Sequence, residues 1–300
     1  MTTFEQQSKA FIQSIQTRKR NPVKPATVAK YEACLKHALS LFGNRNLSQV
    51  NNSDLKVLVK MLSDEGLSAS TITGVAVVVK LVVASAVNEQ GEELYPRSWN
   101  SEFADLPVVN PVSQKAPIAT REGVQDAIGA ARGQDKALYA LLAGTGLRVG
   151  EALALAISDW DKQNMALSIT KTVVKGRIQD STKTEAGTRQ VDLTPELNDF
   201  LIRSIQHTDG LMFRSAIGGV VRQMSAYDKL EKVGISGFHS LRRFRATHLE
   251  NASVPRMLAK FWLGHNATDI SEKYMKFGSD ILARKQWTTK AGLGFELPRT

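Results

Sequence analysis

The sequence predicts a mainly helical protein with one small antiparallel β-sheet. Apolar residues recur at helical spacing through the first hundred residues, and again from Thr194 to Arg284. Between these regions lie three short segments that are typical of strands, separated by glycines. A segment with three prolines divides the chain. We therefore expect an all-helical N-terminal domain and a mixed α+β domain after it.

The N-terminal region has the pattern of four helices joined by short connections. We expect them at Phe4–Thr17, from Pro25 to near Gly43, at Leu55–Leu62 with an end at Gly66, and from Ser68 or Ser70 to about Glu89. The last of these contains a valine-rich run that would also suit a strand. Its Lys80 disfavours a membrane span, because an ammonium group is costly in lipid.

The proline-rich segment lies between Leu106 and Pro117 and reads as an extended linker. The expected division is a helical domain at residues 1–105, a linker at 106–118 and a mixed domain at 119–300.

The second region mixes helices and strands. We expect helices after Thr120, at Ala137–Ala143 with an end at Gly144, and at Glu151–Ile157. Strands are expected at Met165–Lys171, Arg177–Lys183 and Arg189–Leu193, with turns at Gly176 and Gly187. Thr194 and Pro195 then form a helix start, and the chain from there to Arg284 has a helical pattern.

The charge balance favours a polyanionic partner. The chain of 300 residues has a net charge of +10 and 42% hydrophobic residues, so it is basic and well able to bury cores. Residues 1–60 hold ten Lys or Arg against three Asp or Glu. This excess includes Arg18, Lys19, Arg20 and Lys24. A solvated face and a contact with a phosphate backbone explain this cluster equally well.

Several classes of site are excluded or disfavoured. The single cysteine, Cys34, excludes a disulfide framework and a cysteine-based metal site within one chain. The five histidines lack the spacing of zinc sites. The N-terminus lacks the apolar core of a signal peptide. We expect no cofactor, no metal ion and no membrane span.

Four residues near the C-terminus have the chemistry of a phosphate site. His239 and Arg242 are three residues apart in a helical pattern, so they project from one face. His265 follows a break at Gly264, and Tyr274 lies nine residues later. Two imidazoles, a guanidinium and a phenol suit phosphate chemistry better than a core.

Two earlier residues fit the same chemistry, although each alone has an ordinary explanation. Arg148 follows a glycine turn and begins a helix, where the helix dipole favours an anion. Lys183 lies at a hairpin, where an ammonium group held near a leaving oxygen is able to act as a general acid. A solvated arginine and a solvated lysine are the alternatives.

Taken together, these motifs closely resemble the tyrosine recombinases (the phage integrase family). The resemblance rests on Gly-Leu-Arg148-Val-Gly-Glu151, Thr-Lys183-Thr, His239-Ser-Leu-Arg242, Leu-Gly-His265 and Tyr274, in that order. It covers residues 120 to 285, and the N-terminal region looks like the family's core-site DNA-binding domain. The mixed domain is then identified as the catalytic domain.

The resemblance implies a role for each residue. Tyr274 would attack a DNA phosphodiester and form a 3′-phosphotyrosyl link, without ATP or metal. Arg148 and Arg242 would clamp the non-bridging oxygens, and Lys183 would protonate the leaving 5′-oxygen. The remaining roles are smaller: His239 handles the tyrosine proton, His265 hydrogen-bonds the phosphate, and Glu151 positions His239 or Arg148.

The resemblance also implies partners. One partner is double-stranded DNA, and the other is further copies of this chain, which would form a tetramer on two DNA sites. Off DNA, a monomer is the alternative. The expected location is the cytoplasm, with the protein associated with the nucleoid when it is on DNA. Arg18, Lys19, Arg20, Lys24 and Arg243 are the expected DNA-binding residues. In the family, a C-terminal segment such as residues 280–287 with residues 292–297 packs onto a neighbouring subunit, which we carry over as a hypothesis. A further arm-binding domain is not expected before Phe4.

Two minor departures from the family pattern are Met275 and Lys276 after the tyrosine, and Ser240 after His239. The alternatives to a recombinase are a type IB topoisomerase and a catalytically inactive DNA-binding protein. The target DNA sequence, and the choice between integration, excision and dimer resolution, are left open by the sequence.

Overall fold

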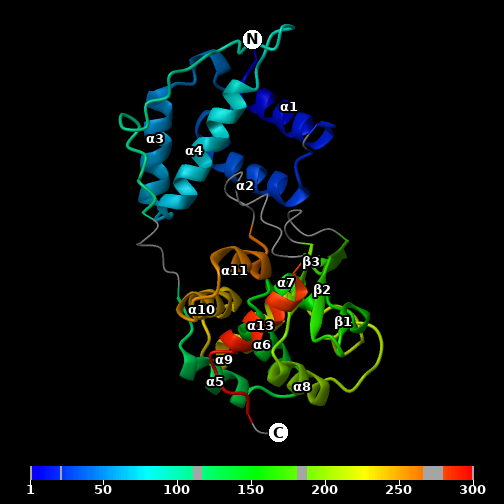
Figure 1. The fold of residues 1–300 in the computed structure, drawn as a ribbon. Coiled ribbons are helices and arrows are strands. Elements are labelled where there is room, and N and C mark those ends of the chain that lie inside the picture. Colours follow the sequence, from blue (N-terminus) through cyan, green and yellow to red (C-terminus); the bar gives the residue numbers. More distant parts are fainter. Residues whose placement is uncertain (1, 21, 111–116, 181–187, 266–279, 299–300) are drawn as a thin grey trace. The chain divides into compact units, whose positions relative to one another are not determined.

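The computed structural model describes residues 2–20, 22–110, 117–180, 188–265 and 280–298. The chain separates into two compact units, Met1–Gln114 and Lys115–Thr300, and each is described by itself. Figure 1 shows helices in both units and strands in the second. The predicted class, mainly helical with a small antiparallel sheet, is confirmed.

The N-terminal unit is a bundle of four helices around one apolar core. They are α1 (Phe4–Thr17), α2 (Pro25–Phe42), α3 (Asn52–Asp64) and α4 (Ala69–Ala84), with a 3₁₀ turn at Leu47–Gln49. Their starts follow local chemistry. The Thr3 side chain accepts from the Gln6 backbone N–H while the Gln6 side chain accepts from Thr3 N–H, and Pro25 opens α2.

The valine-rich segment is a helix, and it ends earlier than predicted. Helix α4 buries one broad face of apolar side chains between Ile72 and Val83, while the apolar Val77 and Leu81 on its other side are exposed. It stops at Ala84 rather than near Glu89. The chain turns back, because the Asn88 side chain accepts from two backbone N–H groups and Leu94 N–H donates to the Ala86 carbonyl.

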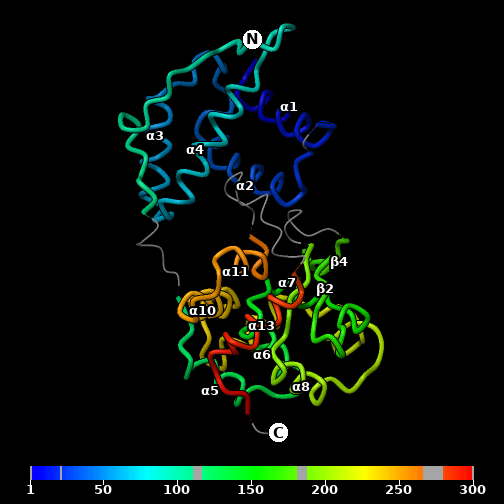
Figure 2. Tube along the Cα trace, viewed as in Figure 1, coloured from blue at the N-terminus to red at the C-terminus, as the bar shows by residue number. Residues whose placement is uncertain are grey.

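The C-terminal unit has helices packed around a small sheet. Its helices are α5 (Arg121–Ala130), α6 (Gln134–Thr145), α7 (Val149–Ala154), α8 (Pro195–Ser204), α9 (Gln223–Lys232), α10 (Phe238–Asn251), α11 (Arg256–Leu263) and α13 (Ile281–Ala291). Helix α6 is buried over Ala137–Thr145 and packs against α5, α8 and α10, so it forms the centre of this core. Figure 2 traces the same arrangement as a tube.

The sheet differs in detail from the three predicted strands. Strands β1 (Trp160–Asp161), β2 (Ala166–Ile169) and β5 (Arg189–Asp192) form an antiparallel sheet in the order β1-β2-β5, while β3 (Thr172–Val174) and β4 (Arg177–Gln179) form a separate hairpin. The first predicted strand is therefore shorter than expected, and the hairpin follows it. A turn with positive φ at Lys175 and Gly176 makes the hairpin. The end of the second predicted strand lies outside the described residues.

The predicted bounds of two helices need correction. Helix α6 continues through Gly144, which packs against Leu197, and it stops at Gly146, whose φ of 71° is left-handed. Helix α7 begins at Val149 and ends at Ala154, before the predicted Ile157.

Residues 205–222 are not helical, although their apolar pattern suggested a helix. The backbones of Ala156 and Leu211 pair as a bridge, and so do those of Arg214 and Val220. These pairings satisfy backbone groups that a helix would otherwise satisfy internally.

The C-terminal segment packs on its own unit. Leu293 and Phe295 are buried in the main core, and the Arg245 guanidinium donates to the Gly292 carbonyl over 2.7 Å. Docking of this segment onto a neighbouring subunit stays a prediction. Among the described residues, no helix is long and apolar enough to cross a membrane.

Candidate active site

Arg148 lies at the junction of two helices. Helix α6 ends at Gly146, and Arg148 is the N-cap of α7, with 37% of its side chain exposed. Only glycine fits at position 146, because a Cβ there would lie 2.6 Å from the Leu263 side chain in a left-handed backbone. The glycine turn thus aims a partly exposed guanidinium from the start of a helix.

Glu151 is the buried carboxylate beside this arginine. Its side chain is 2% exposed and accepts from the Arg148 backbone N–H over 3.0 Å and from the Arg148 guanidinium over 2.8 Å. A second guanidinium, from Arg189, donates to it over 3.0 Å. Burial alone would raise the pKa of Glu151, but the hydrogen bond and charge of Arg189, and then the bonds from Arg148, hold this pKa below its usual range. Glu151 is therefore an anion at neutral pH.

Arg189 was not recognised in the sequence as a site residue. It begins β5, its side chain is 1% exposed, and its Nε donates to the Trp262 carbonyl over 2.8 Å. One signal could have found it. In a strand, Arg189, Val191 and Leu193 face the same way, so an apolar pattern already placed this arginine on the buried face.

Arg242 is the second predicted phosphate ligand, and it is buried in α10. Its two terminal nitrogens donate to the Gly146 carbonyl over 2.7 Å and to the Leu263 carbonyl over 2.5 Å. Burial, followed by repulsion from Arg148, lowers the pKa of Arg242 to about 10, so the group remains charged at neutral pH.

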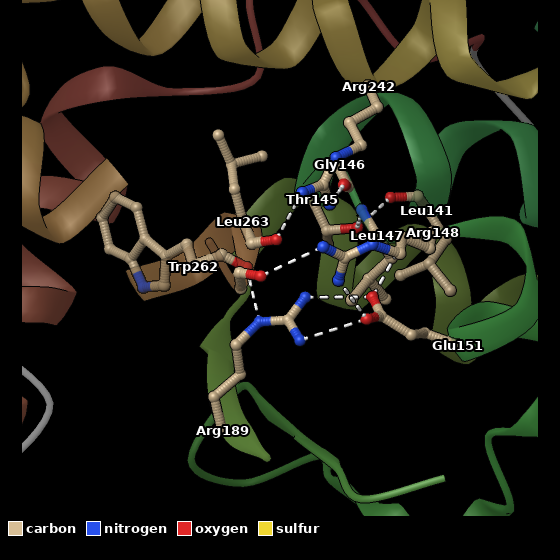
Figure 3. A network of polar contacts seen from close by, with 11 residues as sticks. Leu141, Thr145, Gly146, Leu147, Arg148, Glu151, Arg189, Arg242, Trp262 and Leu263 are labelled. Carbon is tan, nitrogen blue, oxygen red and sulfur yellow. Dashed lines mark hydrogen bonds and ion pairs between the residues drawn. The ribbon is translucent and has the colours of Figure 1, made fainter. Parts of the chain in front are cut away.

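These arginines meet at the C-terminal end of helix α11. The last carbonyls of α11 and its cap, those of Trp262, Leu263 and Gly264, each accept from a different guanidinium. The donors are Arg189, Arg242 and Arg148 respectively, as Figure 3 shows for this network. The unpaired carbonyls of a helix end carry partial negative charge, which favours cations there. The contacts bring Arg148 and Arg242, predicted from distant motifs, to adjacent residues.

The same end of helix α11 leads into His265. Gly264 caps α11 with a φ of 64°, and the N–H groups of Gly264 and His265 donate to the carbonyls of Phe261 and Lys260. His265 therefore follows the three-arginine contact directly, and its side chain is exposed.

His239 lies in the first turn of α10, one helical turn before Arg242, and is exposed. Partial desolvation lowers the pKa of His239 and of His265, and the nearby arginine charges lower both further. For His239 these charges come from Arg243, Arg242 and Arg148. Both imidazoles are therefore neutral at pH 7, and each has one nitrogen able to accept a proton.

The model of the phage integrase family matches residues 120–278, more than half of the chain. The chain belongs to the phage integrase family. Tyrosine recombinase XerS of Streptococcus pneumoniae (strain ATCC 700669 / Spain 23F-1) is 29% identical over 161 residues, which cover 49% of this chain and 43% of XerS. The chain thus matches less than half the length of this relative.

Solved structures share the fold of this family member. The Tn1549 transposon integrase in complex with transposon right end DNA has a TM-score of 0.72 at 19% identity, covering 95% of this chain and 94% of that chain. A lambda integrase tetramer bound to a Holliday junction has a TM-score of 0.66 at 15% identity, covering 89% of this chain and 78% of that chain. At these identities the likeness concerns the fold.

Two predicted residues of the integrase site, Lys183 and Tyr274, lie outside the described residues. The described part of the site therefore consists of Arg148, Glu151, Arg242, His239 and His265, with Arg189 added by the structure. Within the described ranges, no three His, Cys, Asp or Glu side chains are grouped so that they could hold a metal ion.

The predicted DNA-binding residues are split between the two units. Arg18, Lys19, Arg20 and Lys24 are exposed in the connection between α1 and α2. Arg243 is half-buried, and its guanidinium donates to the Pro117 carbonyl over 3.2 Å.

Proposed function

We propose that this chain is a site-specific DNA recombinase of the integrase type. It cuts and rejoins double-stranded DNA through a 3′-phosphotyrosyl intermediate. The observation that carries the proposal is the group of three guanidinium groups on adjacent carbonyls, with one carboxylate between two of them. Such a group retains positive charge and suits an anionic phosphodiester.

The chemistry follows from the charges and protons that these residues supply. The Tyr274 oxygen attacks phosphorus, the bond from phosphorus to the 5′-oxygen breaks, and the free end becomes a 5′-hydroxyl. Neutral His239 takes the phenol proton, and Lys183 gives a proton to the leaving oxygen. The reverse attack by a 5′-hydroxyl of another strand reseals the DNA, and the phosphotyrosyl bond conserves the energy of the broken bond.

The arginines stabilise the transition state. Arg148 and Arg242 hold the non-bridging oxygens, where charge increases during attack, and His265 donates a hydrogen bond to the phosphate. A lysine would be a poor substitute because it lacks the planar pair of donors. In this arrangement the arginines do the work of a metal ion, and the reaction uses no ATP and no cofactor.

The proposal includes the domain roles and the partners. Residues 1–105 form a core-site DNA-binding domain, residues 106–118 a linker, and residues 119–300 the catalytic domain. Exposed Arg18, Lys19, Arg20 and Lys24 contact the phosphate backbone, together with Arg243. Four copies assemble on two DNA sites in the cytoplasm, where the protein associates with the nucleoid.

A trapping experiment tests the proposal. The protein is incubated without metal or ATP with nicked duplexes that tile the DNA flanking its coding sequence, so that the short cleaved strand diffuses away. We expect a covalent adduct that Tyr274→Phe abolishes. Absence of an adduct on every duplex would favour an inactive DNA-binding protein. Relaxation of any supercoiled plasmid by a monomer would favour a type IB topoisomerase.

A further inference from the structure

Glu151 and Arg189 form a buried pair that the motif-based roles do not use. Both side chains are almost fully buried, at 2% and 1% exposure, and their charged atoms lie 3.0 Å apart. Arg148, by contrast, touches the same carboxylate from a partly exposed position. One carboxylate is therefore shared between one buried and one accessible guanidinium.

Because Glu151 is shared, less of its negative charge offsets the positive charge of Arg148, which stays available to an anionic ligand. Glu151 paired with Arg148 alone would form a neutral pair, and the carboxylate would compete with a phosphate for the same guanidinium. Counted over the described residues, Glu151, Arg148 and Arg189 together carry a net charge of +1. Since Arg189 is buried, the accessible part of this charge is on Arg148.

Arg189 also contacts the segment that precedes His265. Its Nε donates to the Trp262 carbonyl, and a Cβ at Gly264 would lie 2.6 Å from its terminal nitrogen. The close packing fixes the end of α11 against β5. A change at Arg189 would therefore alter the Arg148 charge and the direction of the chain at His265.

We propose that Arg189 is a positioning residue for DNA cleavage, which neutralises Glu151 so that the charge of Arg148 remains available to the scissile phosphate. The inference rests on the proposed function and adds a residue to it. Arg189 acts through Glu151 and Arg148 and does not touch the phosphate itself.

The first test measures adduct formation in single turnover, with protein saturating the nicked duplex on which the wild type reacts. We expect Arg189→Met to lower the rate by about 10- to 100-fold, the range for groups that orient a directly acting residue. Arg189→Lys keeps the charge but loses the forked donors, so an intermediate rate is expected. Leu201→Ala, a fully buried change in α8, is the control for lost stability.

Two readouts separate charge neutralisation from a merely structural role. On a duplex with a neutral methylphosphonate at the scissile position, the defect of Arg189→Met should become several-fold smaller, because less charge needs to be bound. Adding Glu151→Gln to Arg189→Met should raise the rate above that of the single variant, because the competing anion is gone. A structural role predicts equal defects on both substrates and no rescue.

The outcomes are distinguishable from a failure of the proposed function. If the wild type forms no adduct, the proposed function fails. If the wild type reacts and Arg189→Met matches Leu201→Ala on both substrates, the inference alone is overturned. If Arg189→Met does not fold, Arg189→Lys decides: a rate loss for Arg189→Lys that is equal on both substrates and is not reduced by adding Glu151→Gln would overturn it.

Discussion

The two ends of strand β5 lie beside two buried acid–base clusters of opposite character. At its start, Arg189 and Arg148 share the single carboxylate of Glu151. At its end, Asp192 pairs with one cation, Arg284, over 3.1 Å and accepts from the Trp262 indole over 2.8 Å. Both clusters contact the last turn of α11, and within the described ranges the first holds more guanidinium groups than carboxylates while the second does not.

The difference distinguishes a cluster suited to binding an anion from a cluster that stabilises the fold. Among the described residues, the Asp192 carboxylate and the Arg284 guanidinium balance each other in charge, and their contacts join α13, β5 and α11 within the fold. The Glu151 cluster keeps net positive charge next to an accessible arginine. The following changes test this contrast, from the largest expected effect to the smallest.

Asp192→Asn should be among the most destabilising single changes in the C-terminal unit. It removes the carboxylate charge beside the buried Arg284 guanidinium, which is 4% exposed, and the loss of such a buried partner costs about 3–5 kcal/mol of unfolding free energy. Urea unfolding followed by tryptophan fluorescence measures this loss. The cleavage rate of the folded variant should stay near that of the wild type. An unchanged unfolding free energy would contradict the structural assignment of this cluster.

Arg242→Lys should, unlike Asp192→Asn, cause a large loss of cleavage rate. Removing one preorganised donor of the transition state lowers the rate about 10²–10³-fold. Arg245→Lys is the matched control, because Arg245 is also buried in α10 and burial also lowers its pKa to about 10, but it donates to the Gly292 carbonyl at the C-terminal segment. Equal rate losses in the two variants would show that burial, and not contact with the phosphate, sets the effect.

The pH profile should reflect the neutral histidines. Because the pKa of His239 lies below the ordinary 6.5, the adduct rate should level off by neutral pH and fall at lower pH, as the imidazole protonates. Stability follows the same direction. The unfolded chain binds more protons between the lowered pKa and 6.5, so stability rises with pH through this window and is complete above it.

Single-turnover rates and thermal melts from pH 5 to 8 measure both trends for the histidines. His239→Asn should remove the low-pH fall in the rate. A wild-type rate that already declines between pH 8 and 7 would contradict the neutral assignment.

The smallest effect is expected at a single exposed cation of the N-terminal unit, Lys19. Lys19→Ala should weaken DNA binding at all sequences alike and reduce the slope of log affinity against log salt by about 1. Fluorescence anisotropy across a salt series measures the slope. Lys9→Ala, an exposed lysine on α1 that already pairs with Glu5, is the control and should leave the slope unchanged.

Local signals account for the parts of the fold that the sequence predicted. Helix α1 has its predicted bounds because Thr3 and Gln6 fix the start by a capping box. The end of α6 was misplaced, since Gly144 and Gly146 look alike in sequence. Only packing against Leu197 and Leu263 separates the helical glycine from the left-handed one. Residues 205–222 contain one local backbone bridge, Arg214 with Val220, and one long-range bridge, Leu211 with Ala156, and a local sequence pattern does not predict the second.

In the candidate site, too, residues in recognisable motifs were predicted, and a residue whose role depends on a contact between distant elements was not. The sequence predicted Arg148 and Arg242 as phosphate ligands, and the structure brings both to the end of α11. It also gave Glu151 the choice of positioning His239 or Arg148, and the carboxylate contacts Arg148. Arg189 was missed because its importance depends on a partner 38 positions earlier in the chain, on another element.

The central claim is that this charge cluster serves a phosphodiester attacked by Tyr274. Mass spectrometry of the trapped protein–DNA adduct after digestion tests it most directly, because it identifies the residue that carries the nucleotide. We expect the nucleotide on Tyr274, linked through a 3′-phosphate, in the wild type and no such peptide in Arg242→Ala. A nucleotide attached to any other residue, or a 5′-linked adduct, would contradict the claim.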